Sequence, residues 1–524
     1  MDNQSNPPKA QDPPNPGRRL DNIAADVHHI IAAELATSSP SSILALAQSS
    51  QTLRHAALPF VYRDVVLARE EDEPTKKATY EALIAQFRDR GEYSIAHHVR
   101  HLVVKNEVPT DDLMMILDAI SELGVLRKLS WENTAHVPPS VLDKLQKTWP
   151  DLELFVNVRG RGRAKHPDHK QMDERLLSSS LLRSLTYQVI YQGYQDNIPV
   201  SLEWAKLTRA ISAGGNLRVL RIQIQAGGDE PQSESQLELS RALHLPALEE
   251  FSLQGTYYNN WNDEHCRMLA NSVDMSKLHT LNIANGMPTS FFRAFTWRLP
   301  GIKTLRLEIR RQDDIGATAA FIRSVDGLEV LDIDAPPSVV DALWPVIVQH
   351  SATLKNLCLR AKVDIERLEQ VTNSFSLIQR LGWRIPHKQR SEYLELMSRM
   401  TLERLELFME LPSTATDFCD ELASGRRGGT ISPSLDKERS QAAAVEIMQS
   451  LSAGKAQPLE RLTMHLTRMS CDERLDPYKL WAKLQVRRDE RSGMQDHFEF
   501  RGKQRWSFRE GVEEELELEG PNVF

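Results

Sequence analysis

Cysteine is scarce in this sequence. Only four cysteines occur in 524 residues, at Cys266, Cys358, Cys419 and Cys471, and no two of them form a CxxC pair. Disulfide frameworks and structural zinc sites both depend on clustered cysteines. We therefore expect neither of them. A chain with so few cysteines suits a reducing compartment, so we expect a cytoplasmic location, a nuclear location, or both.

Long apolar runs and an excess of positive charge are also lacking. No stretch approaches the roughly 18 consecutive apolar residues that indicate a membrane-spanning helix. The 64 Lys and Arg residues are outnumbered by 72 Asp and Glu residues, which gives a net charge of -8. Domains that bind nucleic acid are normally basic. We therefore expect neither a membrane nor a nucleic acid as a partner.

Sequence motifs of enzymes are missing as well. The chain has no GxSxG nucleophile elbow and no HExxH zinc motif. Residues 450–457 resemble the end of a phosphate-binding loop, but they lack its first glycine and its final Ser or Thr. His97, His98 and His101 are close in sequence, yet no acidic third ligand accompanies them. We therefore predict no catalytic residue, no metal and no cofactor.

One short pattern, by contrast, recurs along most of the chain. It consists of an apolar residue, two free positions, an apolar residue, one free position and a third apolar residue. A weaker copy begins at Leu152, and the other copies begin at Val99, Leu126, Leu182, Leu217, Leu248, Leu278, Ile302, Leu328, Leu354, Ile378, Leu402 and Leu459. Successive copies start 24 to 35 residues apart, except for one interval of 57 residues before the last copy.

Each copy predicts a β-strand, because side chains alternate between the two faces of a strand. In the copy at 328–333, Leu331 and Ile333 face one side, while Val330 and Asp332 face the other. One strand cannot bury its apolar side alone, so it stacks on the next copy as a parallel neighbour, and parallel strands need a crossover. Apolar residues at helical spacing predict such crossovers at 111–123, 262–273, 313–325 and 337–350.

This pattern resembles the leucine-rich-repeat family in its irregular, helix-containing form. The resemblance implies an α/β solenoid over residues 99–470, with parallel strands on the concave face and helices on the convex face. The long interval is rich in Gly, Ser and charge, so we expect a loop insertion at 412–440. Residues 471–524 are expected to form a C-terminal cap with a hairpin around Gly502, followed by an acidic tail.

The residues before the repeats divide into three parts. Residues 1–19 contain five prolines and no apolar cluster, so we expect a disordered tail. Residues 20–67 contain three short stretches with helical spacing, which end at Pro59, and an extended exit follows. Residues 68–98 are expected to form a connecting helical segment. Three short helices can bury little apolar area, so this part needs a partner or the adjoining repeats.

The segment ILALAQSSQTLRHAALPFVYRDVVL at 43–67 leads into the repeats, and it resembles the F-box of fungal F-box/leucine-rich-repeat proteins. The resemblance implies that the helices dock a Skp1-type adaptor, which is linked to a cullin complex, and that the repeats hold an unknown protein substrate for ubiquitin transfer. The docking residues that it implies are Leu20, Ile23, Val27, Ile30, Ile31, Leu35, Ile43, Leu44 and Leu46. The alternative is a leucine-rich-repeat scaffold that binds proteins outside any ubiquitin ligase, with the helices capping the solenoid.

Outward residues on the strands form the predicted substrate surface on the concave face. On the early strands they are small and neutral, as at Ser184, Thr186 and Ser252. On the later strands they are Arg306, Asp332, Arg360, Arg380, Arg384, Arg404, Glu406 and Arg461. Arginine forms bidentate contacts with carboxylates and phosphates, which suits a polar protein partner. The alternative is a solvated strand face whose charges balance one another.

Overall fold

Every copy of the repeated pattern forms a β-strand. The computed structural model describes residues 23–69, 74–91, 94–105, 108–159, 171–190, 200–225, 237, 245–254, 262–284, 289–309, 315–386, 389–411, 447, 451, 459–469, 479–488, 496–507 and 513–519. The predicted tail 1–19, Leu20 and the predicted insertion 412–440 lie outside these residues. The chain divides into two compact units, Met1–Arg183 and Ser184–Phe524, which we call the N-terminal unit and the C-terminal unit.

The N-terminal unit combines a small helical group with a parallel sheet. Its first helices are α1 (Ala25–Ser38), α2 (Pro40–Ser49) and α3 (Gln51–Val61). The extended exit predicted after them is β1 (Asp64–Ala68), which pairs in parallel with β2 (His101–Lys105), and β3 (Lys128–Glu132) and β4 (Glu153–Val158) follow in parallel. The segments between these strands contain α4 (Pro74–Arg88), the 3-10 helix η2 (Ile95–His97), α5 (Thr110–Leu123), α6 (Pro139–Thr148) and, after β4, α7 (Glu174–Leu177).

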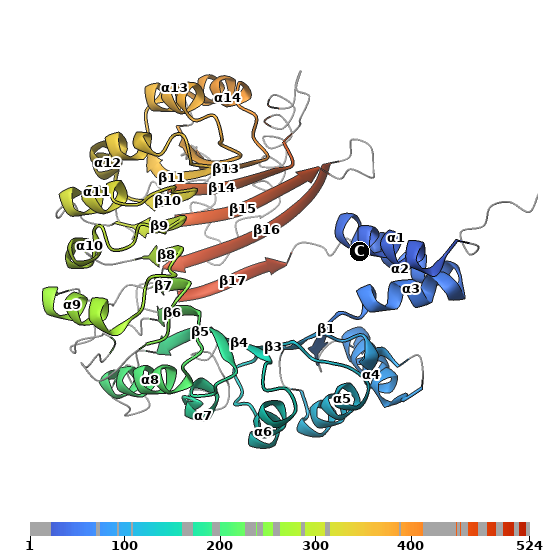
Figure 1. Cartoon of the computed structure of the whole chain (residues 1–524). Coiled ribbons are helices and arrows are strands. Elements are labelled where there is room, and N and C mark those ends of the chain that lie inside the picture. Colours follow the sequence, from blue (N-terminus) through green and yellow to red (C-terminus); the bar gives the residue numbers. More distant parts are fainter. Residues whose placement is uncertain are drawn as a thin grey trace, which may run out of the picture. The chain divides into compact units, whose positions relative to one another are not determined.

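The C-terminal unit continues the same alternation of strand and helix. Its parallel strands are β5 (Leu182–Ile190, paired from Ser184), β6 (Val219–Gln225), β7 (Glu250–Gln254), β8 (Thr280–Ile283), β9 (Thr304–Glu308), β10 (Val330–Asp334), β11 (Asn356–Lys362), β12 (Arg380–Ile385), β13 (Arg404–Leu411) and β14 (Arg461–Met469). Its helices are α8 (Val200–Gly214), α9 (Asp263–Ser272), α10 (Thr289–Phe295), α11 (Ile315–Arg323), α12 (Pro337–Gln349), α13 (Ile365–Ser374) and α14 (Arg390–Ser398), which lie on one side of the strands (Figure 1). The architecture is a repeated parallel strand–helix arrangement, compatible with leucine-rich repeats, and the four predicted crossover helices are confirmed as α5, α9, α11 and α12.

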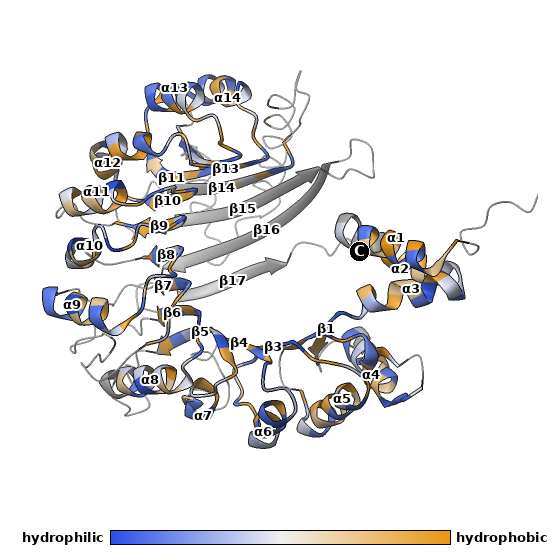
Figure 2. Cartoon of the chain, viewed as in Figure 1, coloured by the Kyte–Doolittle hydropathy of each residue, from blue (hydrophilic) through white to orange (hydrophobic). Residues whose placement is uncertain are grey.

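Burial alternates along β8, β9, β10 and β11 as the pattern predicts. In β10, Leu331 and Ile333 are fully buried toward the helices, whereas Val330 and Asp332 are half-buried on the other face. We call that other face the open face of the sheet. Figure 2 shows the matching division on the helices, which carry hydrophobic residues beside hydrophilic ones. The core of each unit therefore lies between strands and helices.

Several helices begin at residues that favour a helix N-terminus, either a capping side chain or a proline. Asn262 accepts a hydrogen bond from the N–H of His265 (2.8 Å) at the start of α9, and Asp364 accepts one from the N–H of Arg367 (3.1 Å) at the start of α13. Such side chains satisfy N–H groups that have no partner inside the helix. Proline, which has no N–H to satisfy, occupies the first turn of α2, α6 and α12.

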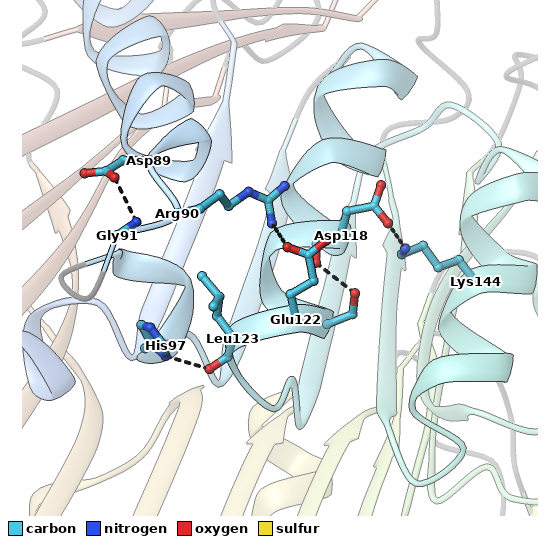
Figure 3. A network of polar contacts seen from close by, with 9 residues as sticks. Asp89, Arg90, Gly91, His97, Asp118, Glu122, Leu123 and Lys144 are labelled. Carbon is cyan, nitrogen blue, oxygen red and sulfur yellow. Dashed lines mark hydrogen bonds and ion pairs between the residues drawn. The ribbon is translucent and has the colours of Figure 1, made fainter.

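Ion pairs join neighbouring helices of the N-terminal unit. Arg90, after α4, donates to Glu122 of α5 (2.8 Å), and Lys144 of α6 pairs with Asp118 of α5 (Figure 3). His97 Nδ1 lies 2.7 Å from the carbonyl oxygen of Leu123 at the end of α5. Each contact joins residues that are 26 or 32 positions apart, about one repeat, so it fixes one helix against the next.

Charged side chains also stack at the entrance to the strands of the C-terminal unit. The residue at the second position of the pattern donates its N–H to the carbonyl oxygen of the same position in the preceding repeat. We call the residues that do this the entry row: Glu249, His279, Lys303, Glu329, Lys355, Gln379, Glu403 and Glu460. Glu329 lies between two lysines, 3.4 Å from Lys303 and 2.7 Å from Lys355, and the hydrogen bond from Lys355 lowers the pKa of Glu329. Opposite charges therefore alternate in this part of the row.

Two details differ from the prediction. Pro59 does not end α3, because Tyr62 N–H still donates to the carbonyl of Leu58 (3.0 Å), so the helix closes its last turn beyond the proline. Gly502 is not at a turn either, because it lies inside β16 (Asp496–Ser507), which pairs antiparallel with β15 (Lys479–Arg488) and with β17 (Glu513–Glu519). β15 in turn pairs antiparallel with β14. The hairpin predicted around Gly502 is wrong.

Gly382 is predicted to tolerate no side chain. A Cβ atom at Gly382 would lie 2.4 Å from Sγ and 3.1 Å from Cα of Cys358, its register partner on β11. We expect Gly382→Ala to lower the free energy of unfolding by about 1–3 kcal/mol through overpacking. Gly301→Ala is the matched control, because its Cβ would meet only the carbonyl oxygen of Leu278 at 3.7 Å. Urea unfolding measures both, and equal losses would contradict the steric explanation.

Acid is predicted to destabilise the chain through His265. Burial lowers the pKa of His265 to about 4, from an ordinary value of 6.5. Between pH 6.5 and about 4 the imidazole of His265 is protonated in the unfolded chain and neutral in the folded chain. The free energy of unfolding is therefore highest above pH 6.5 and decreases as the pH falls below it. We expect His265→Gln to reduce the loss of stability between pH 7 and pH 4.5 by about 2 kcal/mol. Urea unfolding at pH 7 and pH 4.5 measures it, and an unchanged fall would exclude His265 as its source.

Candidate functional site

The predicted docking residues of the first three helices separate into two groups. Ile43 is buried with Ala32 and Ala57 in a small core, and Leu35 and Leu46 pack partly against that core. Ile31 is half-buried. These side chains hold the helices together. They are therefore poor candidates for direct contact with a partner.

The second group lies exposed on the surface. Ile23, Val27, Ile30 and Leu44 have exposed fractions of 38%, 40%, 66% and 51%. They are four of the eight large hydrophobic side chains that are exposed among the described residues. Val27 and Ile30 are three residues apart in α1, so they share one side of that helix, and Ile23 lies just before its start. Leu44 lines a hollow between α2 and α3.

The open face of the C-terminal unit is not uniformly accessible. Ser184, Thr186 and Ser252, predicted to face outward on β5 and β7, are buried with exposed fractions of 6%, 5% and 1%. On β9 to β14 the predicted residues are accessible: Arg306 and Arg380 are exposed, and Asp332, Arg360, Arg384, Arg404, Glu406 and Arg461 are half-buried. The accessible polar part of this face therefore lies on β9 to β14.

Asp332 and Arg360 form the centre of this accessible part. The guanidinium of Arg360 donates to the carboxylate of Asp332 (3.0 Å), and it lies 3.9 Å from the carboxylate of Asp334. Burial raises the pKa of Asp332, although the charge of Arg360 and a hydrogen bond with Cys358 oppose that rise. The register with β12 shifts between Leu359 and Lys362, as at a β-bulge, but burial still alternates through Arg360, which stays on the open face.

An aromatic pair extends this cluster across two further strands. The guanidinium of Arg360 lies over the ring of Phe408, 5.7 Å from its centroid, and Phe408 stacks on His465 with the ring centroids 4.7 Å apart. His465 Nε2 lies 2.6 Å from the carboxylate of Glu406. We call Asp332, Arg360, Glu406, Phe408 and His465 the Arg360 network.

The sequence could have revealed Phe408 and His465. They stand at the seventh position of their copies, as Arg360 and Arg384 do in theirs. Strand alternation places the third, fifth and seventh positions on the same face. Applying that rule to every copy, and not only to the arginines, finds both aromatic residues.

Three arginines lie side by side at the beginning of the last parallel strands. The register pairs Arg380 with Arg404, and Arg404 with Arg461. We call these three residues the arginine row. The Nε atoms of Arg404 and of Arg360 are buried and have no hydrogen-bond partner among the described residues. The arginine row and the Arg360 network lie on the same open face.

The N-terminal unit contains a second polar arrangement on its open face. His101 Nδ1 lies 2.9 Å from Asp64, and His101 Nε2 lies 2.8 Å from the hydroxyl oxygen of Ser130. This is the order of an acid–base–nucleophile relay, and burial lowers the pKa of His101. The N–H groups of β3, however, lie between two parallel neighbours and serve the sheet. They are therefore not free to stabilise an oxyanion beside Ser130.

The described residues contain no group of three or more His, Cys, Asp and Glu side chains arranged to hold a metal ion. Within the same ranges, no helix combines the length and the apolar character that crossing a bilayer requires. No protein-family model matches the chain, and no curated protein matches its sequence.

Removing Arg360 is predicted to destabilise the chain most at neutral pH. In Arg360→Met, the buried carboxylate of Asp332 loses the cation that favours its ionised form, so its pKa rises further. A carboxyl group whose pKa is higher in the folded chain than in the unfolded chain lowers the free energy of unfolding once the pH is high enough to ionise it. At low pH the group is protonated in both states and this loss disappears. We expect a loss of about 1–3 kcal/mol at pH 7 and a smaller loss at pH 5.

The double variant Asp332→Asn with Arg360→Met is the control. Its amide carries no charge, so its loss of stability relative to the unaltered chain should not depend on pH between 5 and 7. Urea unfolding of both variants at the two pH values measures the difference. A loss in Arg360→Met that is the same at both pH values would show that Asp332 and Arg360 are not electrostatically coupled.

Proposed function

We propose that this chain is the substrate-recognition subunit of a Skp1–cullin–F-box ubiquitin ligase. In this proposal α1, α2 and α3 form an F-box that docks a Skp1-type adaptor, and the leucine-rich repeats bind a protein substrate on their open face. The chain performs no chemistry itself. It contributes by holding the substrate near the transferred ubiquitin, which raises the effective concentration of the reacting groups.

The observation that carries the proposal is the exposed apolar group on the first helices. A soluble chain gains free energy by burying such side chains, at roughly 25 cal/mol per Å² of apolar surface. The internal core of the three helices is small, with Ala32, Ile43 and Ala57 at its centre. Apolar residues clustered on so small a unit support the presence of a partner that covers them.

The open face of β9 to β14 supports the second half of the proposal. It combines arginines, carboxylates and a stacked aromatic pair on adjacent strands. Arginine and aromatic side chains are the residues that contribute most to protein–protein binding. The surface therefore suits a polar protein segment better than a small apolar ligand.

The adaptor contact is tested with Ile30→Asp. Ile30 is 66% exposed, so the substitution leaves the folding core intact while it places a carboxylate at the proposed contact. Leu35 would be a worse choice, because it packs against that core. We expect Ile30→Asp to weaken binding to a recombinant Skp1-type adaptor by at least about tenfold, measured by pull-down and by titration calorimetry.

Ala82→Asp is the matched control, because Ala82 is exposed on α4 and lies outside the three helices. It should bind the adaptor as the unaltered chain does. If the unaltered chain retains no adaptor, the ligase proposal fails, and the protein-binding scaffold that caps its repeats with these helices takes its place. If Ile30→Asp binds normally while the unaltered chain also binds, the contact lies elsewhere.

A further inference from the structure

We propose that Trp297, in the turn between α10 and β9, anchors a docking surface for an acidic protein segment. This surface lies where the chain passes from a helix to the start of a strand, so it is distinct from the open face and from α1 to α3. The inference therefore goes beyond the proposed function and does not depend on it. Three observations carry it: the backbone at Trp297, the exposure of its side chain and the charges around it.

The backbone at Trp297 has a conformation that suits glycine. Trp297 has a φ of 65°, and in the part of the chain that the structure describes it is the only residue other than glycine with a positive φ. Arg298 N–H donates to the carbonyl oxygen of Phe295 (2.9 Å), so α10 ends in a tight turn at Trp297 (Figure 1). Glycine is common at such helix ends, because a Cβ atom there lies too close to the backbone. The other described residues with a positive φ are Gly215 and Gly327.

The side chain of Trp297 is also directed away from the core. Its exposed fraction is 71%, the highest among the eight large hydrophobic side chains that are exposed in the described ranges. The aromatic side chains of α10 itself, Phe291, Phe292 and Phe295, are at most 2% exposed. Packing inside the chain therefore does little to offset the strain at Trp297. Strain that the surrounding core does not require is typical of residues with a function.

The turn stands in a basic part of an acidic chain. Residues 274–303 contain four Lys and Arg residues and one acidic residue, Asp274, whereas the whole chain has 64 basic and 72 acidic residues. Apart from Lys303, which pairs with Glu329 (3.4 Å), the stretch still has three basic residues against one acid. The four basic residues are all exposed: Lys277, Arg293, Arg298 and Lys303.

The next repeat adds another arginine beside the turn. Residues 26 positions apart are register partners in β9 and β10, and the hydrogen bond from Asp326 N–H to the carbonyl oxygen of Pro300 (3.1 Å) keeps that spacing outside the strands. Arg323, which is exposed, is therefore the equivalent of Trp297 in the following repeat. The indole thus stands between Arg298 in its own turn and Arg323 in the next.

The chemistry of these side chains selects the partner. Tryptophan and arginine contribute most to protein–protein binding when a partner covers them. The indole offers a large apolar face and one N–H donor, and each guanidinium donates paired hydrogen bonds to a carboxylate. A protein segment with apolar side chains beside Asp or Glu satisfies both groups. An anionic lipid surface suits the charges too, but a single indole in a turn offers little apolar area for membrane binding.

Selection of peptides on the full chain tests the proposal. Short random peptides displayed on phage are selected on the immobilised chain and, in parallel, on Trp297→Gly. We expect the peptides enriched on the unaltered chain alone to contain Asp and Glu beside apolar residues, above their frequency in the library. The proposal is overturned if no peptide is specific to the unaltered chain, or if the specific peptides have no excess of acidic residues.

Further variants locate the contact. The most enriched peptide is labelled with fluorescein, and its binding is measured by fluorescence anisotropy. Trp297→Ala, and separately Arg298→Glu with Arg323→Glu, should each weaken binding at least about tenfold, and added salt should weaken it as well. Leu377→Ala is the matched control, because Leu377 is an exposed apolar residue in the turn before β12, and it should leave binding unchanged. Unchanged binding by Trp297→Ala, or equal weakening by Leu377→Ala, would exclude Trp297 as the anchor.

Urea unfolding separates a docking role from a structural one. Glycine relieves the strain of a positive φ, whereas alanine keeps the Cβ atom that causes it. We expect Trp297→Gly to unfold at a higher urea concentration than the unaltered chain, and Trp297→Ala to show no such gain. If Trp297→Gly unfolds at a lower urea concentration, the indole stabilises the fold and the proposal is overturned.

Two binding measurements separate this surface from a lipid site and from the proposed function. Sedimentation with vesicles of phosphatidylserine and phosphatidylcholine should show no binding that Trp297→Ala removes, and such binding would overturn the protein partner. Trp297→Ala should still retain the Skp1-type adaptor, since it lies outside α1 to α3. If the unaltered chain binds the selected peptide but no adaptor, the ligase proposal fails and this surface stands. If it binds the adaptor but selects no peptide, the reverse holds.

Discussion

The rest of the structure depends on one row of leucines that stack in register. Successive parallel strands of the C-terminal unit place Leu305, Leu331, Leu357, Leu381, Leu405 and Leu462 opposite one another, and each is at most 1% exposed. No single strand could bury its leucine alone. Each repeat completes the core of the one before it, so stability comes from the interfaces between neighbours. The helices follow because a parallel strand needs a crossover to return to the same end of the sheet.

Stacking in register has a consequence for polar positions. A residue meets the equivalent residue of the next repeat, so any side chain that repels its own kind is costly when it recurs. In the entry row this repulsion is avoided around Glu329, because the acid lies between Lys303 and Lys355 and forms an ion pair with each. At Cys358 and Gly382 the crowding is avoided by size. Gly382 on β12 has no side chain, which leaves room for the thiol of its register partner Cys358 on β11.

The sequence predicted the strands better than it predicted the site. Each copy of the pattern is a strand because spacing and alternation depend on local residues alone. The register shift between β11 and β12 could not be predicted, since it depends on how two strands pair and not on the local pattern of either. The burial of Ser184 and Thr186 was missed for a similar reason. The polarity of a strand residue predicts which face of the sheet it lies on, but it does not predict whether other residues cover that face. Pro59 was misread because a proline removes one N–H and one hydrogen bond, which does not by itself end a helix whose next turn still closes.

The first three helices obey a different constraint from the repeats. A repeat buries its apolar side on the next repeat, whereas α1, α2 and α3 share a small core in which two of the three central residues are alanines. Adding apolar residues to such a unit does not enlarge its core if they point outward, as Ile30 does at 66% exposure. Their contribution to stability must then come from a surface outside the three helices. If the helices only capped the repeats, they would need no more exposed apolar area than the end repeat can cover. A separate docking partner accounts for exposed apolar residues on both α1 and α2. This difference favours the adaptor over the cap.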